Sequence, residues 1–485
     1  GMEQGNDVYE NQELPIAASD VDCILLTHAH IDHSGLIPLM YVNGFRGQVY
    51  STSATAQLCE IMLRDSAHIQ MFEAEWRNRK AARSGGKLKE FVPLYDMDAA
   101  VNVCKQFVGC EYDRVYDIAE GIKIRFTDVG HLLGSASIEV WATEKTENGD
   151  VTEKIVFSGD IGNINKPIIK DPKHVRDADY VVMESTYGNR SHGGTPNYVE
   201  DLTDIFKRTF ERGGNVVIPS FAVGRTQELL YIIRKIKEDN LVGRDFDVYM
   251  DSPLAIEATN IFIKNVESCF DDEAVELVRK GINPLSFPGL KYATTGDESK
   301  QINFDPNPKV IISSSGMCEA GRIRHHLKHN LWRPECTIVF VGYQAVGTTG
   351  RIIVDGAEEI KLFGEPIQIK AEIVQLKGSS GHADKDGLLC WINAFDTKPK
   401  KVFVVHGEDS VCDEFTECLK EEYGYDAMAP YTGGSYDLIA DRVISEGVKE
   451  RKTRRTTSTQ RGKTVFDRLV AAGKRLMTVI THNEG

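Results

Sequence analysis

The sequence predicts an α/β protein in which one domain is interrupted by a second. Histidines and carboxylates follow short apolar runs early in the chain, at residues 28–33, and again late, at residues 382 and 406. Between them, over about residues 195–350, apolar runs alternate with segments of helical periodicity, which is typical of a parallel sheet with crossover helices. At 485 residues the chain is too long for one ordinary core, so we expect two or three domains.

Composition narrows the class of protein. The chain is 41% hydrophobic and 27% charged, and it contains no apolar run long enough to cross a membrane. Its ten cysteines form no CxxC pair, and the polar residues 1–11 show no signal peptide, so we expect reduced thiols in a cytoplasmic protein. A net charge of -15 argues against a generic nucleic-acid-binding surface but leaves room for a local basic channel.

The densest chemical signal follows the apolar run at residues 23–26, which predicts a buried strand. His28, His30, Asp32 and His33 lie within six positions after it. Imidazole and carboxylate are ligands that zinc accepts, and two histidines two positions apart in extended chain point to the same side. Asp32 and His33 follow a turn and can face a second ion. A chance cluster on a solvated loop is the weaker alternative.

Other candidate residues also follow predicted strands. His131 comes after the alternating run at 121–127, Asp160 after 154–157 and Glu184 after 180–183. Taken alone, His131 would be an ordinary core or surface histidine, and Asp160 a turn residue. Beside the first cluster, His131 is favoured as a metal ligand.

The middle block carries loops suited to anions. The predicted strand 215–219 leads through Ser220 and Arg225 into a helix that reaches residue 237, and a helix N-terminus after a strand binds anions well. The predicted strand 309–312 leads to Ser315, Gly316 and Arg322. Together these loops favour phosphate contacts, although each one alone could be a capped turn or a solvated helix face.

The remaining elements complete the expected organisation. We predict a helix over residues 53–72, an exposed loop over 77–89 and a strand of the first domain over 367–375. The expected divisions are a first metal-domain part at 1–194, an insertion at 195–352, a second metal-domain part at 353–445, and a basic tail at 446–485. In the tail, residues 464–480 have the pattern of a packing or dimerisation helix.

These motifs resemble a known family. Residues 28–33 match the HxHxDH motif of the metallo-β-lactamase superfamily, and Glu184, His382 and His406 match the three motifs of its β-CASP nucleases. The resemblance runs from residue 1 to about 440 and implies an αββα sandwich with an inserted Rossmann-like β-CASP domain. Family members carry strands and an Asp ahead of HxHxDH, whereas residues 1–21 show no clear strand, so we expect those N-terminal strands to be missing.

The resemblance also implies roles for individual residues. One zinc ion would be held by His28, His30, His131 and Asp160, and a second by Asp32, His33, Asp160 and His406; manganese or iron is not excluded. Catalysis would fall to Asp32 and Asp160 with the metals and to His382 as proton donor, held by Glu184. Neighbouring phosphates would be gripped by Ser220, Arg225, Ser315, Gly316 and Arg322.

The expected function is hydrolysis of single-stranded RNA by a homodimer, in endonuclease or 5′→3′ exonuclease mode. A histidine at position 406, where DNA-repair members have valine, points to RNA. Two alternatives remain open. One is another hydrolase of the same fold, acting on a thioester, lactone or sulfate, and the other is a catalytically weak subunit that scaffolds RNA processing.

Overall fold

The structure is a computed structural model that describes residues 14, 16–83, 91–147, 149–191, 193, 197–376 and 380–449. Nearly all of the expected basic tail, including its helix, lies outside the described residues, as do residues 1–13. Ahead of the first strand, the described residues contain only the 3-10 turn Ala18–Asp20. None of the helices in these ranges combines the length and hydropathy needed to cross a bilayer.

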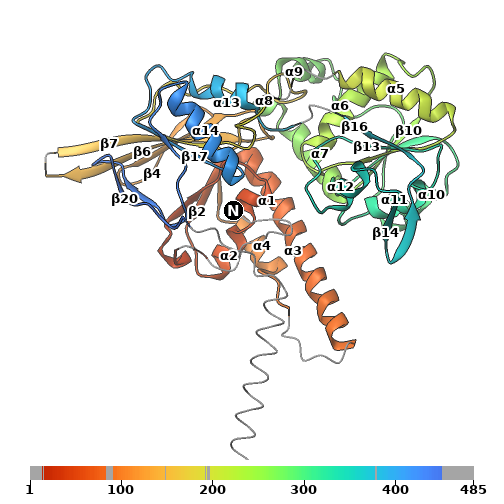
Figure 1. The fold of residues 1–485 in the computed structure, drawn as a ribbon, viewed down its shortest axis with the longest axis horizontal. Helices are drawn as coiled ribbons and strands as arrows, with labels where there is room; N and C mark the ends of the chain where they lie inside the picture. The colour runs from red at the N-terminus through yellow and green to blue at the C-terminus, as the bar shows by residue number, and fades with distance from the viewer. Residues whose placement is uncertain are drawn as a thin grey trace, which may run out of the picture.

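Two sheets pack face to face in the region that carries the first motif (Figure 1). The smaller sheet is parallel, with the order β1-β2-β3, and the larger has the order β18-β17-β8-β7-β6-β5-β4. Leu25 and Tyr50 of the first sheet pack against Phe126 and Ile138 of the second. The strands are β1 (Cys23–Leu25), β2 (Gln48–Thr52), β3 (Phe107–Cys110), β4 (Val115–Ala119), β5 (Ile122–Asp128), β6 (Ala136–Thr146), β7 (Gly149–Phe157), β8 (Tyr180–Glu184), β17 (Lys401–Val405) and β18 (Ala427–Met428).

Helices cover the outer face of each sheet. Trp391 and Phe415, from two late helices, share one buried cluster with Val181 of β8, and the early helices pack against the smaller sheet. The expected sandwich of two sheets between helices is therefore confirmed. The helices are α1 (Ile31–Ser34), α2 (Ile37–Val42), α3 (Ser53–Arg83), α4 (Met97–Cys104), α13 (Lys385–Ile392) and α14 (Asp409–Glu421), and a hairpin of β19 (Ser435–Asp437) and β20 (Arg442–Ser445) follows.

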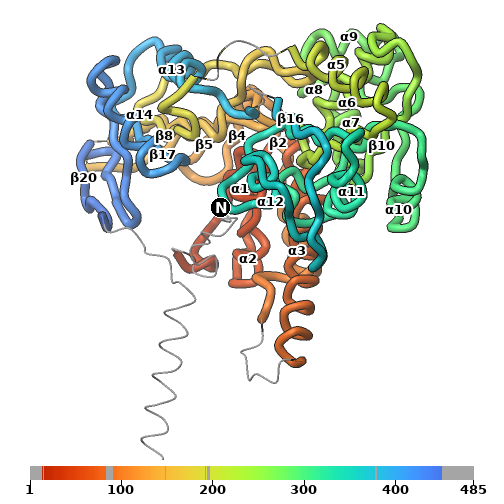
Figure 2. Tube along the Cα trace, turned by 45° about the vertical axis from the view of Figure 1, so that its right-hand side comes forward, coloured from red at the N-terminus to blue at the C-terminus, as the bar shows by residue number. Residues whose placement is uncertain are grey.

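Helix α3 is longer than its sequence pattern predicts. It runs for 31 residues and projects past the other described elements (Figure 2). The expected exposed loop over 77–89 is wrong as far as Arg83, and residues 84–90 lie outside the described ranges. Ion pairs of Arg77 with Glu73 and of Arg79 with Glu75, each four residues apart, stabilise this solvent-exposed extension without an apolar face.

The inserted region forms a second α/β layer structure, on the right of Figure 1. Its parallel sheet has the order β11-β10-β12-β9-β13-β16, and β9, β12 and β13 are buried along their whole length, as expected for strands covered by helices on both faces. The elements are α5 (Tyr198–Glu211), β9 (Val216–Pro219), α6 (Arg225–Glu238), β10 (Asp247–Asp251), α7 (Pro253–Lys264), α8 (Val266–Cys269), α9 (Asp272–Arg279), β11 (Leu290–Tyr292), α10 (Gly296–Phe304), β12 (Lys309–Ser313), α11 (Ile323–Asn330), β13 (Thr337–Phe340), α12 (Thr349–Val354), β14 (Glu359–Leu362), β15 (Glu365–Gln368) and β16 (Glu372–Gln375).

The expected single strand over residues 367–375 is wrong. Its first part belongs to β15, which forms a hairpin with β14, and its second part is β16, which pairs in parallel with β13. The break lies at Lys370 and Ala371, whose amides both donate to the carbonyl of Leu331. The segment therefore completes the inserted sheet and does not belong to the first domain, contrary to the division expected at residue 353.

The insertion is packed against the metal-binding region. One buried cluster contains residues of α3, of the 129–135 loop and of α6 and α7. Polar contacts join the same elements: Arg64 pairs with Glu257 at 3.1 Å, and the Asn265 side chain donates to Gln57 at 3.0 Å. The insertion therefore forms part of the wall around the candidate site.

Candidate active site

The first four candidate ligands lie where β1 leads into α1. The strand ends at Leu25, His28 and His30 follow in a connection without regular secondary structure, and α1 begins at Ile31, so that Asp32 and His33 lie in its first turn. The strand itself is half-buried along its three residues, not fully buried as expected. This short connection places all four side chains at one edge of the sheet.

Two further loops bring in His131 and Asp160. The His131 loop turns at Gly130 and Gly134, whose φ angles of 66° and 81° are in the left-handed region that favours glycine. Its backbone is fixed by Ser135, whose hydroxyl accepts from the amide of His131 at 3.0 Å. Gly162, just after Asp160, passes so close that an added Cβ would lie 2.0 Å from the carbonyl oxygen of Gly130.

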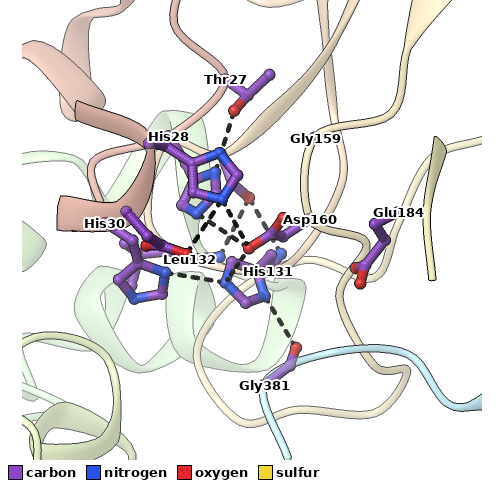
Figure 3. Close-up of polar contacts among 12 residues, drawn as sticks. Thr27, His28, His30, His131, Leu132, Gly159, Asp160, Glu184 and Gly381 are labelled. Carbon is purple, nitrogen blue, oxygen red and sulfur yellow. Dashed lines mark hydrogen bonds and ion pairs between the residues drawn. The ribbon is translucent and has the colours of Figure 1, made fainter. Parts of the chain in front are cut away.

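The structure gathers the seven candidate ligands into two sets that share Asp160. The inner ligand set consists of His28, His30, His131 and Asp160, and the outer ligand set of Asp32, His33, Asp160 and His406. Within each set the candidate donor atoms all lie within 4.8 Å of one another. Figure 3 shows the inner set closing around the carboxylate of Asp160.

The spacing of these donor atoms fits tetrahedral cation sites. Nε2 of His28 and of His131 lie 3.3 and 3.7 Å from Oδ2 of Asp160, and Nε2 of His131 lies 3.1 Å from Nδ1 of His30. In the outer set, Nε2 of His33 lies 3.1 Å from Nε2 of His406, and Nε2 of His406 lies 3.5 Å from Oδ2 of Asp32. Neighbouring ligands of a tetrahedral zinc ion lie about 3.3 Å apart, because zinc–nitrogen bonds are about 2.0–2.1 Å long.

Two buried polar atoms need a partner that the described side chains do not supply. Nε2 of His28 and Oδ1 of Asp160 are both buried and make no hydrogen bond. Such groups are costly unless they are paired, and a cation between them would satisfy both. The residues therefore fit a bound divalent metal.

Neighbouring oxygens orient the ligand histidines. The hydroxyl of Thr27 lies 3.1 Å from Nδ1 of His28, and the carbonyl of Gly381 lies 3.2 Å from Nδ1 of His131 (Figure 3). Thr186 Oγ1 lies 3.1 Å from Nδ1 of His406. With Nδ1 engaged in this way, Nε2 is the nitrogen left for a metal in each ring. Sequence reasoning assigned no role to these partners, because nothing in the sequence distinguishes a threonine hydroxyl or a backbone carbonyl that faces a ligand.

His382 and Glu184 form a third group beside the ligands. Nδ1 of His382 lies 3.2 Å from both carboxylate oxygens of Glu184, which is buried at the end of β8. Glu184 is itself fixed by the amide of Ile161, which donates to Oε1 at 2.5 Å. Burial lowers the pKa of His382, but Glu184 outweighs that effect and raises the pKa to about 9. The imidazole is therefore protonated at neutral pH.

Only some of the predicted phosphate-binding residues face open space. Ser220 is buried and accepts from Thr226, and Ser315 is bonded to its own loop at Ala320. Gly316 packs against Phe221. Arg225 lines a pocket of about 390 Å³ together with Ser380, two residues before His382, and its guanidinium also donates to Glu228.

Arg322 is already engaged elsewhere. Its guanidinium donates to Asp251 at 2.7 Å and to the backbone carbonyls of Ala293 and Thr294. Asp251 also accepts from the buried His326 at 2.6 Å. This network joins β10 to α11 inside the insertion. Both terminal nitrogens of the Arg322 guanidinium therefore have acceptors within the insertion, and the sequence pattern could not reveal them.

The fold and the paired ligand sets define a metal-dependent hydrolase of the metallo-β-lactamase type with an inserted domain. Comparison with known proteins agrees. Residues 226–353 match the family described as Beta-Casp domain, and residues 366–430 match the Zn-dependent metallo-hydrolase RNA specificity domain.

Curated relatives extend this match along most of the chain. A protein named ribonuclease TTHA0252, from Thermus thermophilus, is 33% identical over 410 residues, which cover 84% of this chain and 86% of the relative. The transcription termination factor FttA of Methanosarcina mazei is 32% identical over 88% of this chain but only 66% of its own length. An RNase J-like protein of Methanocaldococcus jannaschii is 31% identical over 80% of this chain and 82% of the relative. The chain belongs to the β-CASP ribonucleases of the metallo-β-lactamase superfamily.

Proposed function

We propose that this protein hydrolyses phosphodiester bonds of single-stranded RNA with two zinc ions, one in each ligand set. The observation that carries the proposal is the carboxylate of Asp160, which lies within reach of histidines from both sets. A carboxylate shared in this way suits two adjacent cations. RNA as substrate is supported by the relatives named as ribonucleases and by the matched RNA specificity domain.

The residues around the ligands suit hydrolysis at phosphorus. A pair of bound divalent cations supplies a water nucleophile near neutral pH and neutralises charge on the phosphodiester. Glu184 holds Nδ1 of His382, so Nε2 is the nitrogen left to donate a proton to the 3′ oxygen as its bond to phosphorus breaks. Attack by water then leaves a 5′-phosphate on one product and a 3′-hydroxyl on the other. Asp160 and Asp32 would act by holding the metals. Each position of the inner and outer ligand sets carries a residue that can bind a metal, which disfavours the scaffold alternative.

Cleavage of end-labelled RNA tests this proposal directly. Zinc-loaded protein is incubated with single-stranded RNA labelled at the 5′ or the 3′ end, beside an Asp160→Ala control. Internal fragments would identify an endonuclease, and mononucleotides released from the 5′ end an exonuclease. Absence of cleavage by a protein shown to hold two zinc ions would overturn the proposal, as would equal cleavage by the Asp160→Ala control.

Among the predicted phosphate-binding residues, we propose Arg225 as a contact with RNA and Arg322 as a residue that stabilises the insertion. Arg225 lines the pocket that reaches Ser380, and Ser220, Ser315 and Gly316 lie at the ends of the paired strands β9 and β12. Replacing Arg225 by Met should raise KM for RNA, because a phosphate contact is lost. Replacing Arg322 by Met should instead lower the thermal stability and leave KM nearly unchanged, since its guanidinium is bound to Asp251. A raised KM in Arg322→Met with normal stability would restore it as a phosphate contact.

Three coarser expectations complete the proposal. All ten cysteines are free thiols, which supports a reducing compartment such as the cytoplasm. We propose a homodimer, which sedimentation would test. We also propose that the metal domain is discontinuous, with its first part ending near residue 194 and its second part beginning after β16.

A further inference from the structure

Lys166 connects a candidate metal ligand to the insertion. Its ammonium donates to the backbone carbonyl of His131 at 2.9 Å and lies 3.2 Å from Oε1 of Glu228 in helix α6. Glu228 also accepts from Arg225 at 2.5 Å. All three side chains are largely enclosed, with 11%, 9% and 16% of the Lys166, Glu228 and Arg225 side chains exposed.

The surrounding contacts are tight. Helix α6 begins against the His131 loop: a Cβ added at Gly224 would lie 3.0 Å from Leu132. Between this group and the His131 loop the free space is about 10 Å³, at the lower limit for one water molecule, whereas on their other side Lys166, Arg225 and Glu228 line the pocket of about 390 Å³. The Lys166–Glu228 pair is mostly shielded from solvent, so its two charges attract one another more strongly than a fully exposed pair would.

The segment that carries Lys166 also carries Asp160. The amide of Gly162 donates to the carbonyl of Val129 at 2.8 Å, and the amide of Asn163 donates to the carbonyl of Gly381, which faces the His131 ring. Lys166 therefore fixes the His131 backbone from the same segment that supplies the shared carboxylate. Its second contact, to Glu228, belongs to the insertion.

We infer that Lys166 is a positioning residue that holds the metal ligand His131 in place. Because Lys166 also pairs with Glu228, the inner metal site depends on the position of helix α6 of the insertion. The inference rests on the proposed role of His131 as a ligand. Removing Lys166 leaves Glu228 paired with Arg225, so the substitution does not strand a buried charge. We therefore expect the variant without Lys166 to fold, but with a more mobile His131.

A matched control lies four residues along the chain. Lys170 also ties this segment to the insertion, since its ammonium donates to the carbonyl of Ser268 at 2.8 Å, but that carbonyl belongs to α8 and not to a ligand loop. Lys166→Met and Lys170→Met thus remove the same charge and the same kind of contact. They differ in that Lys166 alone contacts His131 and pairs with Glu228, and its side chain is the more enclosed of the two.

The test is the rate at which zinc passes from loaded protein to a colour-forming chelator. We expect Lys166→Met to release one of its two zinc ions about 10–100-fold faster than the unmodified protein, as loss of a group that orients a ligand does in other zinc sites. Lys170→Met should release both at the unmodified rate, and Lys166→Arg should recover part of the loss. The cobalt-loaded Lys166→Met protein should also show an altered visible absorption spectrum. Unchanged zinc release and an unchanged cobalt spectrum in Lys166→Met would overturn the inference.

A second variant tests the dependence on the insertion. Glu228→Gln touches no ligand, yet it should accelerate the release of the same zinc ion, and the double variant Lys166→Met/Glu228→Gln should release it no faster than Lys166→Met alone. Additive effects would overturn the coupling. Should Lys166→Met fail to fold, Lys166→Gln is compared with Lys170→Gln in the same way.

RNA binding separates this inference from the proposed function. Affinity of the metal-free protein for single-stranded RNA should be the same within about twofold in Lys166→Met, whereas a weaker affinity with normal zinc release would make Lys166 a phosphate contact and overturn the inference. If the unmodified protein holds zinc but cleaves no RNA, the proposed function fails and the zinc-release comparison still decides the role of Lys166.

Discussion

The inner and outer ligand sets share one carboxylate but differ in their surroundings. His28 and His131 of the inner set are buried, and their Nδ1 atoms are held by Thr27 and Gly381. In the outer set, 48% of the Asp32 side chain and 33% of the His406 side chain are exposed. The inner set is thus the more buried of the two, whereas the outer set opens to solvent.

The electrostatics of the two sets differ in the same sense. Burial lowers the pKa of His30 to about 3 and lowers the pKa values of His28 and His131, so the inner imidazoles are already in the neutral form that binds metals. Burial also disfavours charge on His33, but hydrogen bonds to Asp160 and Asp32 outweigh it and raise the pKa to about 10. Metal binding at the outer set would therefore release a proton from His33, so we expect the two ions to differ in affinity.

The largest effect should come from the residue common to both sets. Asp160→Ala should lower kcat/KM by more than about 10³-fold and reduce the zinc content of both sites, because it removes the shared carboxylate. Zinc analysis and RNA cleavage measure the two effects. Full activity in this variant would show that Asp160 does not bridge the sets.

The next largest effect should come from a residue outside both sets. His382→Ala should retain both zinc ions and lower kcat by about 10²–10⁴-fold, as expected for the loss of a general acid. Zinc analysis of the purified variant is the decisive measurement. Loss of zinc would mean that His382 is a ligand and that the division into two sets is wrong.

Removing one histidine from the outer set should separate the two sites. His406→Ala should lose the outer ion and keep the inner one. Only Asp32, His33 and the shared Asp160 then remain for the outer ion, whereas the inner ligand set is complete. Titration of the unmodified protein with a chelator should likewise remove one ion before the other. Simultaneous loss of both ions in either experiment would contradict a difference in affinity.

The smallest effect concerns the stability of metal-free protein against pH. The pKa of His30 is about 3 in the folded chain and about 6.5 when unfolded, so the unfolded state binds more protons between these values and stability falls as the pH falls through them. The pKa of His33 is about 10 when folded, so its contribution is complete below about pH 6.5 and is lost as the pH rises to about 10.

Two variants should therefore reduce the pH dependence of the unfolding free energy, one on the acid side and the other on the alkaline side. His30→Ala should reduce the loss of unfolding free energy on the acid side, and His33→Ala the loss on the alkaline side. Denaturant unfolding over a pH series gives both slopes, and comparing slopes removes the constant cost of each substitution. A change on the same limb in both variants would contradict the opposed pKa shifts.

The ligands could be found from the sequence because of where they lie along the chain. His131, Asp160 and Glu184 each follow an apolar run, and the carboxyl ends of neighbouring strands meet at one edge of a sheet. The partner of Arg322 could not be found in the same way, since a basic residue after a glycine-containing loop gives no sign of a buried aspartate 71 positions earlier. The length of α3 was also missed, because ion pairs rather than an apolar face stabilise its exposed end.

By itself the sequence indicated the class of fold and the metal-ligand candidates at residues 28–33 and 131, because local periodicity and residue type encode strands and their chemistry. The roles of Asp160 and His406 and the pairing of His382 with Glu184 were implied by the resemblance to the β-CASP family. Only the tertiary structure decided which ligands are buried and which are open, and that Lys166 and Glu228 join His131 to the insertion. It also decided that β16 completes the inserted sheet. These features depend on contacts between segments far apart in the chain, and such contacts leave no pattern in either segment alone.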